Sequence, residues 1–133
     1  MQQPVFIKVC AQRHDSDCAL CCFVMLCGIS YEAALVAIGH VDQKLATNGL
    51  YFTQIRRAAA QLGIKLQSLK KGTYDPQNSV GILGVRFKDK QEHAVLLFRG
   101  TIIDPDGGLV YDDLDAYIEA AKVKTIGSLL VAT

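Results

Sequence analysis

The feature that most restricts the fold is an unbroken apolar segment, Cys18–Cys27. A helix of this sequence has no polar face to turn toward water, so protein must surround it on every side. Residues 15–17 (Asp-Ser-Asp) offer caps for its first turn, and Gly28 is a typical residue at a helix end. The rest of the chain is therefore predicted to pack around one buried central helix.

Two further helices are predicted directly after it. Ser30 can cap a helix that covers residues 30–38 and ends before Gly39. Residues 52–62 have helical periodicity up to Gly63, and residues 43–49 are predicted to form the connecting loop. The apolar face of the last helix is predicted to contain Phe52, Ile55, Ala59 and Leu62.

Strand patterns dominate after Gly63. The runs with strand character are 64–69, 80–87, 93–98, 101–103 and 125–131. Short charged or glycine-containing separations predict antiparallel hairpins between consecutive runs. Residues 104–108 are predicted as a turn and 111–121 as a short amphipathic helix, while 4–10 suit a short strand or an extended lead-in. Helices first and an antiparallel sheet second make an α+β fold.

Length and charge limit the classes of protein to which the chain can belong. A chain of 133 residues, half of them hydrophobic, is predicted to form one domain, 1–133. With 14 basic and 13 acidic residues the net charge is +1, which argues against nucleic acid as a partner. No run approaches the roughly 18 apolar residues of a membrane span, and the N-terminus lacks the pattern of a signal peptide.

The cysteines favour a reducing compartment. Their number is five, and Cys18, Cys21, Cys22 and Cys27 lie in one predicted helix, where a disulfide framework is hard to build. Free thiols in the cytoplasm are therefore expected. Apart from Cys18, the cysteines are predicted to be core residues.

Cys18 is the candidate nucleophile. It lies at the first turn of the buried helix, where the positive end of the helix dipole favours a thiolate. Asp15 and Asp17 oppose this effect, because like charge raises a thiol pKa unless the carboxylates turn away or cap amides. A neighbouring imidazolium would have to outweigh them.

Three other residues complete a candidate catalytic set. His93 begins a predicted core strand, which is a rigid mount for a general base. Asp104 follows the next strand, where its carboxylate can orient the imidazole, although Asp-Pro is also a common turn sequence. Gln12, in the loop before the helix, can donate its side-chain amide to an oxyanion, as can backbone amides at the helix start.

These residues resemble a known family. Gln12, the pair Asp17-Cys18, the run that begins at His93 and the pair Asp104-Pro105 occur in the order found in papain-like peptidases that remove double-glycine leaders from bacteriocins. The resemblance covers nearly the whole chain, from Gln12 to the last strand. Ala19 stands where the family usually has glycine.

The resemblance implies a papain-like fold, with the nucleophile at the start of a buried helix that packs on a C-terminal antiparallel sheet. It implies a cysteine peptidase in which Cys18 is the nucleophile, His93 the base, Asp104 the orienting residue and Gln12 the oxyanion donor. It also implies cleavage after small residues such as glycine, in a peptide or protein substrate. No cofactor or metal is expected, and a separate transporter or host protein is a possible partner.

Several alternatives stay open at this point. The same groups can perform deamidation or transamidation. A catalytically silent peptide-binding module of the same fold, or a small effector that modifies a host protein, would also fit the sequence. The spacing of His14, Cys18 and Cys21, with His40 as a fourth ligand, allows a zinc site, although one thiol-rich helix suits zinc poorly.

Overall fold

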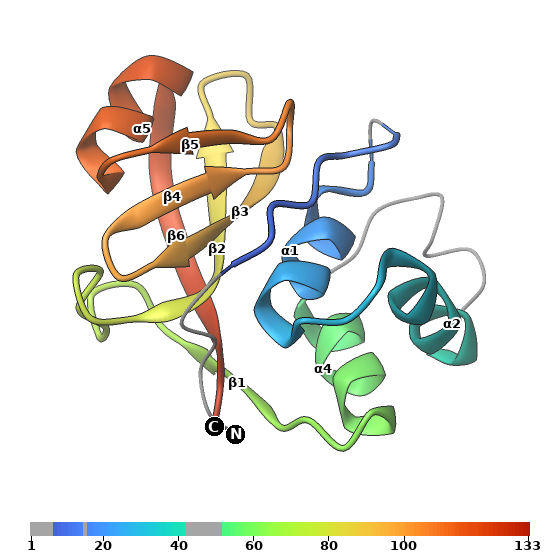
Figure 1. The fold of residues 1–133 in the computed structure, drawn as a ribbon. Helices are drawn as coiled ribbons and strands as arrows, with labels where there is room; N and C mark the ends of the chain where they lie inside the picture. The colour runs from blue at the N-terminus through green and yellow to red at the C-terminus, as the bar shows by residue number, and fades with distance from the viewer. Residues whose placement is uncertain (1–6, 15, 42–51) are drawn as a thin grey trace.

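Three helices lie on one side of the molecule and a six-stranded sheet on the other in the computed structural model, which describes residues 7–14, 16–41 and 52–133 (Figure 1). A fourth helix of the described chain, α5, covers the opposite face of the sheet. This is the predicted α+β arrangement. The helices are α1 (Cys18–Cys27), α2 (Tyr31–Val41), α4 (Phe52–Gln61) and α5 (Leu114–Ala121), and the strands are β1 (Leu66–Leu69), β2 (Val80–Phe87), β3 (Glu92–Phe98), β4 (Thr101–Asp104), β5 (Leu109–Tyr111) and β6 (Val123–Ala132).

The central helix α1 has the predicted bounds and the predicted burial. Every residue from Ala19 to Leu26 is buried, and the helix packs against β2 and β3 as well as α2. Gly28 ends it in the left-handed conformation, φ +65°, which a residue without a Cβ adopts without strain. Asp17 occupies the N-cap position, but its side chain makes no cap hydrogen bond.

The other two predicted helices differ from expectation at their ends. Ser30 caps α2 as predicted, since its Oγ accepts the Ala33 N–H at 3.0 Å. The helix then continues through Gly39 to Val41, because one glycine inside a helix costs only about 1 kcal/mol relative to alanine and does not stop it.

The predicted apolar face of α4 is only partly correct. Ile55 and Ala59 are buried as predicted, together with Ala58, but Leu62 is 40% exposed. Leu62 lies beyond the last helical residue, where the backbone turns toward Gly63 at φ +74° and no longer follows the helical face.

The sheet is antiparallel throughout and has the order β1-β6-β2-β3-β4-β5. The predicted hairpins β2–β3 and β3–β4 are confirmed. The last strand, β6, does not extend the sheet at its edge but inserts between β1 and β2 and pairs with both.

One predicted helix begins too early, and one strand was not predicted. Residues 109–111 form β5, and α5 starts only at Leu114, where the Asp113 carboxylate accepts the Ala116 N–H at 2.7 Å. The extended cap at Asp113 separates strand from helix. Residues 7–10 form no strand, and the predicted loop at 43–49 lies outside the described residues.

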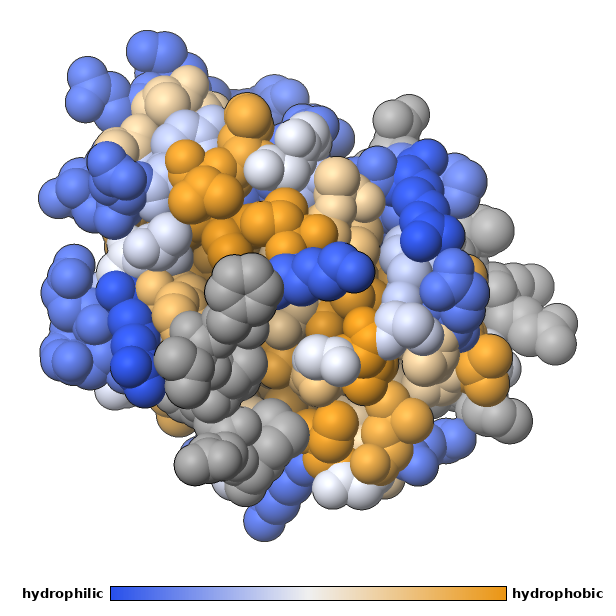
Figure 2. Space-filling view, viewed as in Figure 1, coloured by the Kyte–Doolittle hydropathy of each residue, from blue (hydrophilic) through white to orange (hydrophobic). Residues whose placement is uncertain are grey.

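Alternation along the strands divides the apolar core into two parts. Ile82 and Leu96 face α1 and the other N-terminal helices, whereas Leu83 and Leu97 face Tyr117 and the α5 side. On the face shown in Figure 2, apolar side chains gather toward the middle and hydrophilic ones around the rim. Among the described residues no single helix is long and apolar enough to cross a membrane; only α1 with 31–39, a pair bent by 113°, reaches that length and composition.

A buried hydroxyl leads to a prediction about stability. The Tyr117 hydroxyl is buried and has no hydrogen-bond partner in the described part of the chain, and burial raises its pKa. Since an unpaired buried hydroxyl costs roughly 1–3 kcal/mol, Tyr117→Phe should leave the free energy of unfolding unchanged or raise it by about 1 kcal/mol.

Urea unfolding followed by circular dichroism would measure this effect. Tyr74→Phe is the matched control, because the Tyr74 hydroxyl donates to the Gly127 carbonyl oxygen at 2.8 Å. The control should lose about 1 kcal/mol. An equal loss in Tyr117→Phe would contradict the assignment of an unpaired hydroxyl.

Candidate active site

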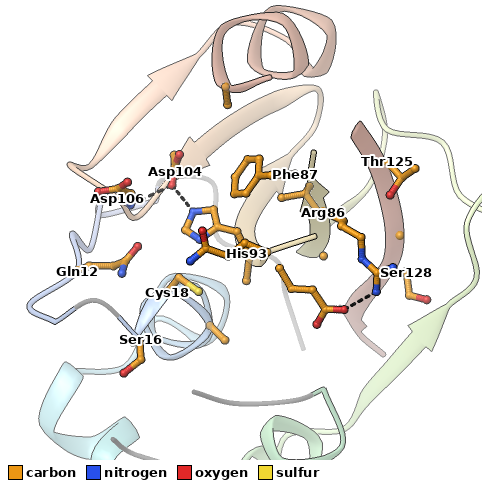
Figure 3. A pocket seen from close by; sticks show the side chains of 18 of the residues that line it. Gln12, Ser16, Cys18, Arg86, Phe87, His93, Asp104, Asp106, Thr125 and Ser128 are labelled. Atoms are coloured by element: carbon orange, nitrogen blue, oxygen red, sulfur yellow. Dashed lines mark hydrogen bonds and ion pairs between the residues drawn. The ribbon is translucent and has the colours of Figure 1, made fainter. Parts of the chain in front are cut away.

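The four residues predicted to act together line one cleft. A cavity of about 1150 Å³ lies between the start of α1 and the sheet, and Gln12, Cys18, His93 and Asp104 all contribute to its wall (Figure 3). Cys18 is the first residue of α1 and is only partly buried, whereas the residues that follow it, Ala19 to Leu26, are buried. The cleft therefore opens at the N-terminal end of the central helix.

The sheet wall carries a buried imidazole–carboxylate pair. His93 Nε2 lies 2.7 Å from Asp104 Oδ1, and the two side chains are only 13% and 11% exposed. Because β3 and β4 pair antiparallel, the start of β3 and the end of β4 lie at the same end of the sheet. Asp104 Oδ1 also accepts the Asp106 N–H at 2.9 Å, so the turn after β4 holds the carboxylate in place.

The two partners of His93 set its charge. Burial alone would lower the pKa of the ring, but interactions with Asp104 and Cys18 outweigh it and raise the pKa to about 9. Because Nε2 is bonded to Asp104, Nδ1 is the nitrogen that remains for Cys18. The raised pKa favours the imidazolium form of His93, and the thiol group of Cys18 is next to the ring (Figure 3). The Phe87 ring covers the imidazole at a centroid distance of 5.8 Å.

Gln12 lies beside the turn that follows β4 and is fixed at both its backbone and its side chain. Its N–H donates to the Pro105 carbonyl oxygen at 2.7 Å, and its Nε2 donates to the His14 carbonyl oxygen at 2.9 Å. The side chain points toward Cys18 and His93 (Figure 3). The Gln12 side chain also helps to lower the pKa of Asp17 through a hydrogen bond, and its Oε1 is buried without a hydrogen-bond partner in the described part of the chain.

Of the other cysteines of α1, Cys21 and Cys22 lie in the interior and Cys27 is partly exposed. Cys21 and Cys22 are fully buried, and burial raises the pKa of both thiols. Burial also raises the pKa of Cys27 to about 12. Within the described ranges, no group of three or more His, Cys, Asp or Glu residues could hold a metal ion. The side chain of His40, one of the residues weighed for zinc, is not among those described.

Two glycines shape the floor of the cleft, and the sequence analysis did not identify them. Gly84 on β2 and Gly127 on β6 lie on neighbouring strands and both line the cavity. A Cβ at Gly127 would come within 3.4 Å of the Gly84 carbonyl oxygen. The strand register shifts between Leu83 and Val85, and a glycine inside a strand pattern is the available signal for such a bulge or close approach.

An ion pair bounds the cleft on the sheet side. Arg86 and Glu92, cross-strand partners on β2 and β3, meet at 2.7 Å and both line the cavity. Their side chains are more than half exposed, so the pair contributes little to stability. It places a cation and an anion beside His93.

Comparison with known proteins supports the fold. No protein-family model matches the chain, and no curated protein matches it in sequence. Its structure is similar to the crystal structure of a double glycine motif protease from an AMS/PCAT transporter in complex with the leader peptide, with a TM-score of 0.63 and 18% sequence identity over 99% of this chain and 98% of that one. The predicted resemblance to this type of protease is thereby confirmed at the level of the fold.

The raised pKa of His93 predicts how stability depends on pH. A histidine with a raised pKa stabilises the folded state fully below its unfolded value and loses this contribution as the pH rises through the folded value. The free energy of unfolding should therefore fall between pH 6.5 and about 9, by up to about 1.4 kcal/mol per pH unit.

Urea unfolding at several pH values would test this, with His93→Gln as the control. The difference between the two curves isolates the histidine. Asp104→Asn should flatten the fall, because it removes the carboxylate that favours the imidazolium. Parallel curves for the unmodified protein and His93→Gln would contradict the assignment.

Proposed function

We propose that this chain is a cysteine peptidase of the papain-like, bacteriocin-processing type. The observation that carries the proposal is the meeting in one cleft of Cys18, at the exposed end of a buried helix, with the buried His93–Asp104 pair. A nucleophile beside a base that a third group orients is the arrangement of covalent acyl-transfer catalysis. The reaction uses no cofactor.

The proposed reaction begins with an ion pair between the Cys18 thiolate and the His93 imidazolium. The sulfur attacks the carbonyl carbon of a peptide bond, and the side-chain amide of Gln12 and the Cys18 backbone amide stabilise the oxyanion. His93 then gives its proton to the leaving amine, and a thioester to Cys18 remains. Water, deprotonated by the same imidazole, hydrolyses the thioester. Asp104 holds the ring in the orientation for both transfers.

The shape of the cleft supports a substrate with small side chains near the cut. Ala19 narrows the helix wall, and the two glycines leave the opposite floor without side chains. An extended peptide with glycine at the cleaved bond fits such a passage, and the structurally similar protease was crystallised with a leader peptide. A separate transporter and a cytoplasmic location stay predictions.

Thiol alkylation tests the proposal without knowledge of the natural substrate. Folded protein is treated with iodoacetamide at pH 5–9, and mass spectrometry measures the rate at each cysteine. Cys18 should react at least about 10-fold faster than Cys27 below pH 7, because an imidazolium stabilises its thiolate. Cys27 serves as the internal reference, since it is also partly exposed.

The variant His93→Ala should slow alkylation of Cys18 by about 10-fold or more at pH 6, and leave Cys27 unchanged. If Cys18 reacts no faster than Cys27, or if the loss of His93 has no effect, the peptidase proposal is wrong and a silent peptide-binding module takes its place.

A substitution in the cleft floor tests the proposed substrate class. Gly84→Val should fold, because a Cβ there meets only Phe52 and the Ser128 carbonyl oxygen, at 3.8 and 3.9 Å. It should lower kcat/KM for acetyl-Gly-Gly-aminomethylcoumarin by about 10-fold or more, mainly through KM, since the added methyl groups occupy the peptide path. Alkylation of Cys18 by the smaller iodoacetamide should not change. If Gly84→Val and the unmodified protein have equal kcat/KM, the substrate does not bind along Gly84.

A further inference from the structure

Asp17 is a buried acidic residue that the proposed reaction does not use. It is 2% exposed and directly precedes Cys18 at the start of α1, yet it does not cap that helix. Its carboxylate accepts three hydrogen bonds from other segments: from the Arg13 N–H at 3.0 Å, the His14 N–H at 3.3 Å and the Tyr31 hydroxyl at 2.8 Å. A buried carboxylate with this many donors fixes the segments that supply them.

One of these bonds leads to Gln12 through a single residue, His14. The His14 N–H donates to Asp17 Oδ1, and the His14 carbonyl oxygen accepts Gln12 Nε2 at 2.9 Å. At the other end of the loop, the Gln12 N–H is bonded to Pro105, next to Asp104. The loop that presents the Gln12 amide is therefore held at one end by the Asp17 carboxylate and at the other by the turn after β4.

Tyr31 ties the carboxylate to the second helix. It is the first residue of α2, and its ring is buried. The Arg13 guanidinium lies 3.8 Å from the centre of this ring and pairs with Glu32 at 3.3 Å. Tyr31 therefore contacts both partners. Its hydroxyl donates to Asp17, and the face of its ring packs against the Arg13 guanidinium of the loop.

The hydrogen bonds also keep Asp17 ionised. Burial alone would raise its pKa, but the bonds from Tyr31 and from the Arg13 and His14 amides outweigh burial and lower the pKa. Both carboxylate oxygens are directed at these donors. The negative charge of Asp17 is thus stabilised by donors on the loop and on α2.

We propose that Asp17 and Tyr31 are positioning residues, which hold the Gln12 amide in place as oxyanion donor through the backbone of His14. The inference rests on the proposed peptidase function. An N-cap role cannot explain the geometry, since the carboxylate makes no cap bond to α1. A role in packing alone does not explain why the Asp17 carboxylate accepts hydrogen bonds from the Arg13 and His14 amides, which directly follow Gln12 in the loop.

Two reactions at the same sulfur separate this role from a role in stability. Alkylation by iodoacetamide forms no oxyanion, so its rate reports the thiolate and His93 alone. Hydrolysis of acetyl-Gly-Gly-aminomethylcoumarin passes through an oxyanion and requires Gln12. Loss of one oxyanion donor typically lowers kcat by about 100-fold or more, and loss of its positioning should cost a part of that.

Tyr31→Phe removes only the hydroxyl and keeps the ring under Arg13. It should lower kcat about 10-fold, with KM and the Cys18 alkylation rate within about twofold. Asp17→Asn should lower kcat further without slowing alkylation, because the new side-chain amide nitrogen would face an N–H donor of the loop. Ser79→Ala, which loses one hydroxyl hydrogen bond outside the cleft, should change neither rate.

The possible outcomes separate a failure of the positioning role of Asp17 and Tyr31 from a failure of the proposed peptidase function. If the unmodified chain neither cleaves the peptide nor shows fast alkylation at Cys18, the proposed function fails and the inference fails with it. If the unmodified chain cleaves and folded Tyr31→Phe and Asp17→Asn keep its kcat, only the positioning role is overturned. A parallel fall in cleavage and alkylation would also overturn it, since the defect would then lie in the Cys18–His93 pair.

Discussion

Burial of α1 is the constraint on which the rest of the structure depends. An apolar helix with no polar face must be enclosed, and here the sheet and α2 pack against it, with residues of α4 in the same core cluster. Its first two residues, Cys18 and Ala19, line the cleft. The demand for burial therefore creates both the core and the place where a thiol is accessible at a helix N-terminus.

The sequence predicts those parts of the fold that depend on local patterns. The bounds of α1, the β2–β3–β4 hairpins and the cap at Ser30 follow from apolar runs, turn residues and a hydroxyl. It could not predict that β6 inserts between β1 and β2, since strand order depends on packing between distant segments. The predicted end of α2 at residue 38 is wrong, because tertiary contacts outweigh the small loss of helix stability that Gly39 causes.

The same distinction holds for the candidate site. His93 and Asp104 could be paired from the sequence because a short hairpin links them, and the structure places them 2.7 Å apart. The proximity of Gly84 and Gly127 could not be predicted, because it depends on the pairing of β2 with β6, which brings together these two residues 43 positions apart, and on a register shift within that pairing. Nor could the bond from Tyr31 to Asp17 be foreseen, since it joins two helix starts whose angle the sequence does not reveal.

Two buried carboxylates flank the Cys18–His93 pair, and their donors give them opposite roles. Asp104 faces the imidazole, so its charge raises the pKa of the ring and favours the cation next to the sulfur. Asp17 directly precedes Cys18 in sequence, yet its carboxylate oxygens are bonded to two loop amides and a tyrosine hydroxyl. Hydrogen-bond geometry, rather than proximity in sequence, decides which of the two carboxylates acts on the imidazole and which on the loop.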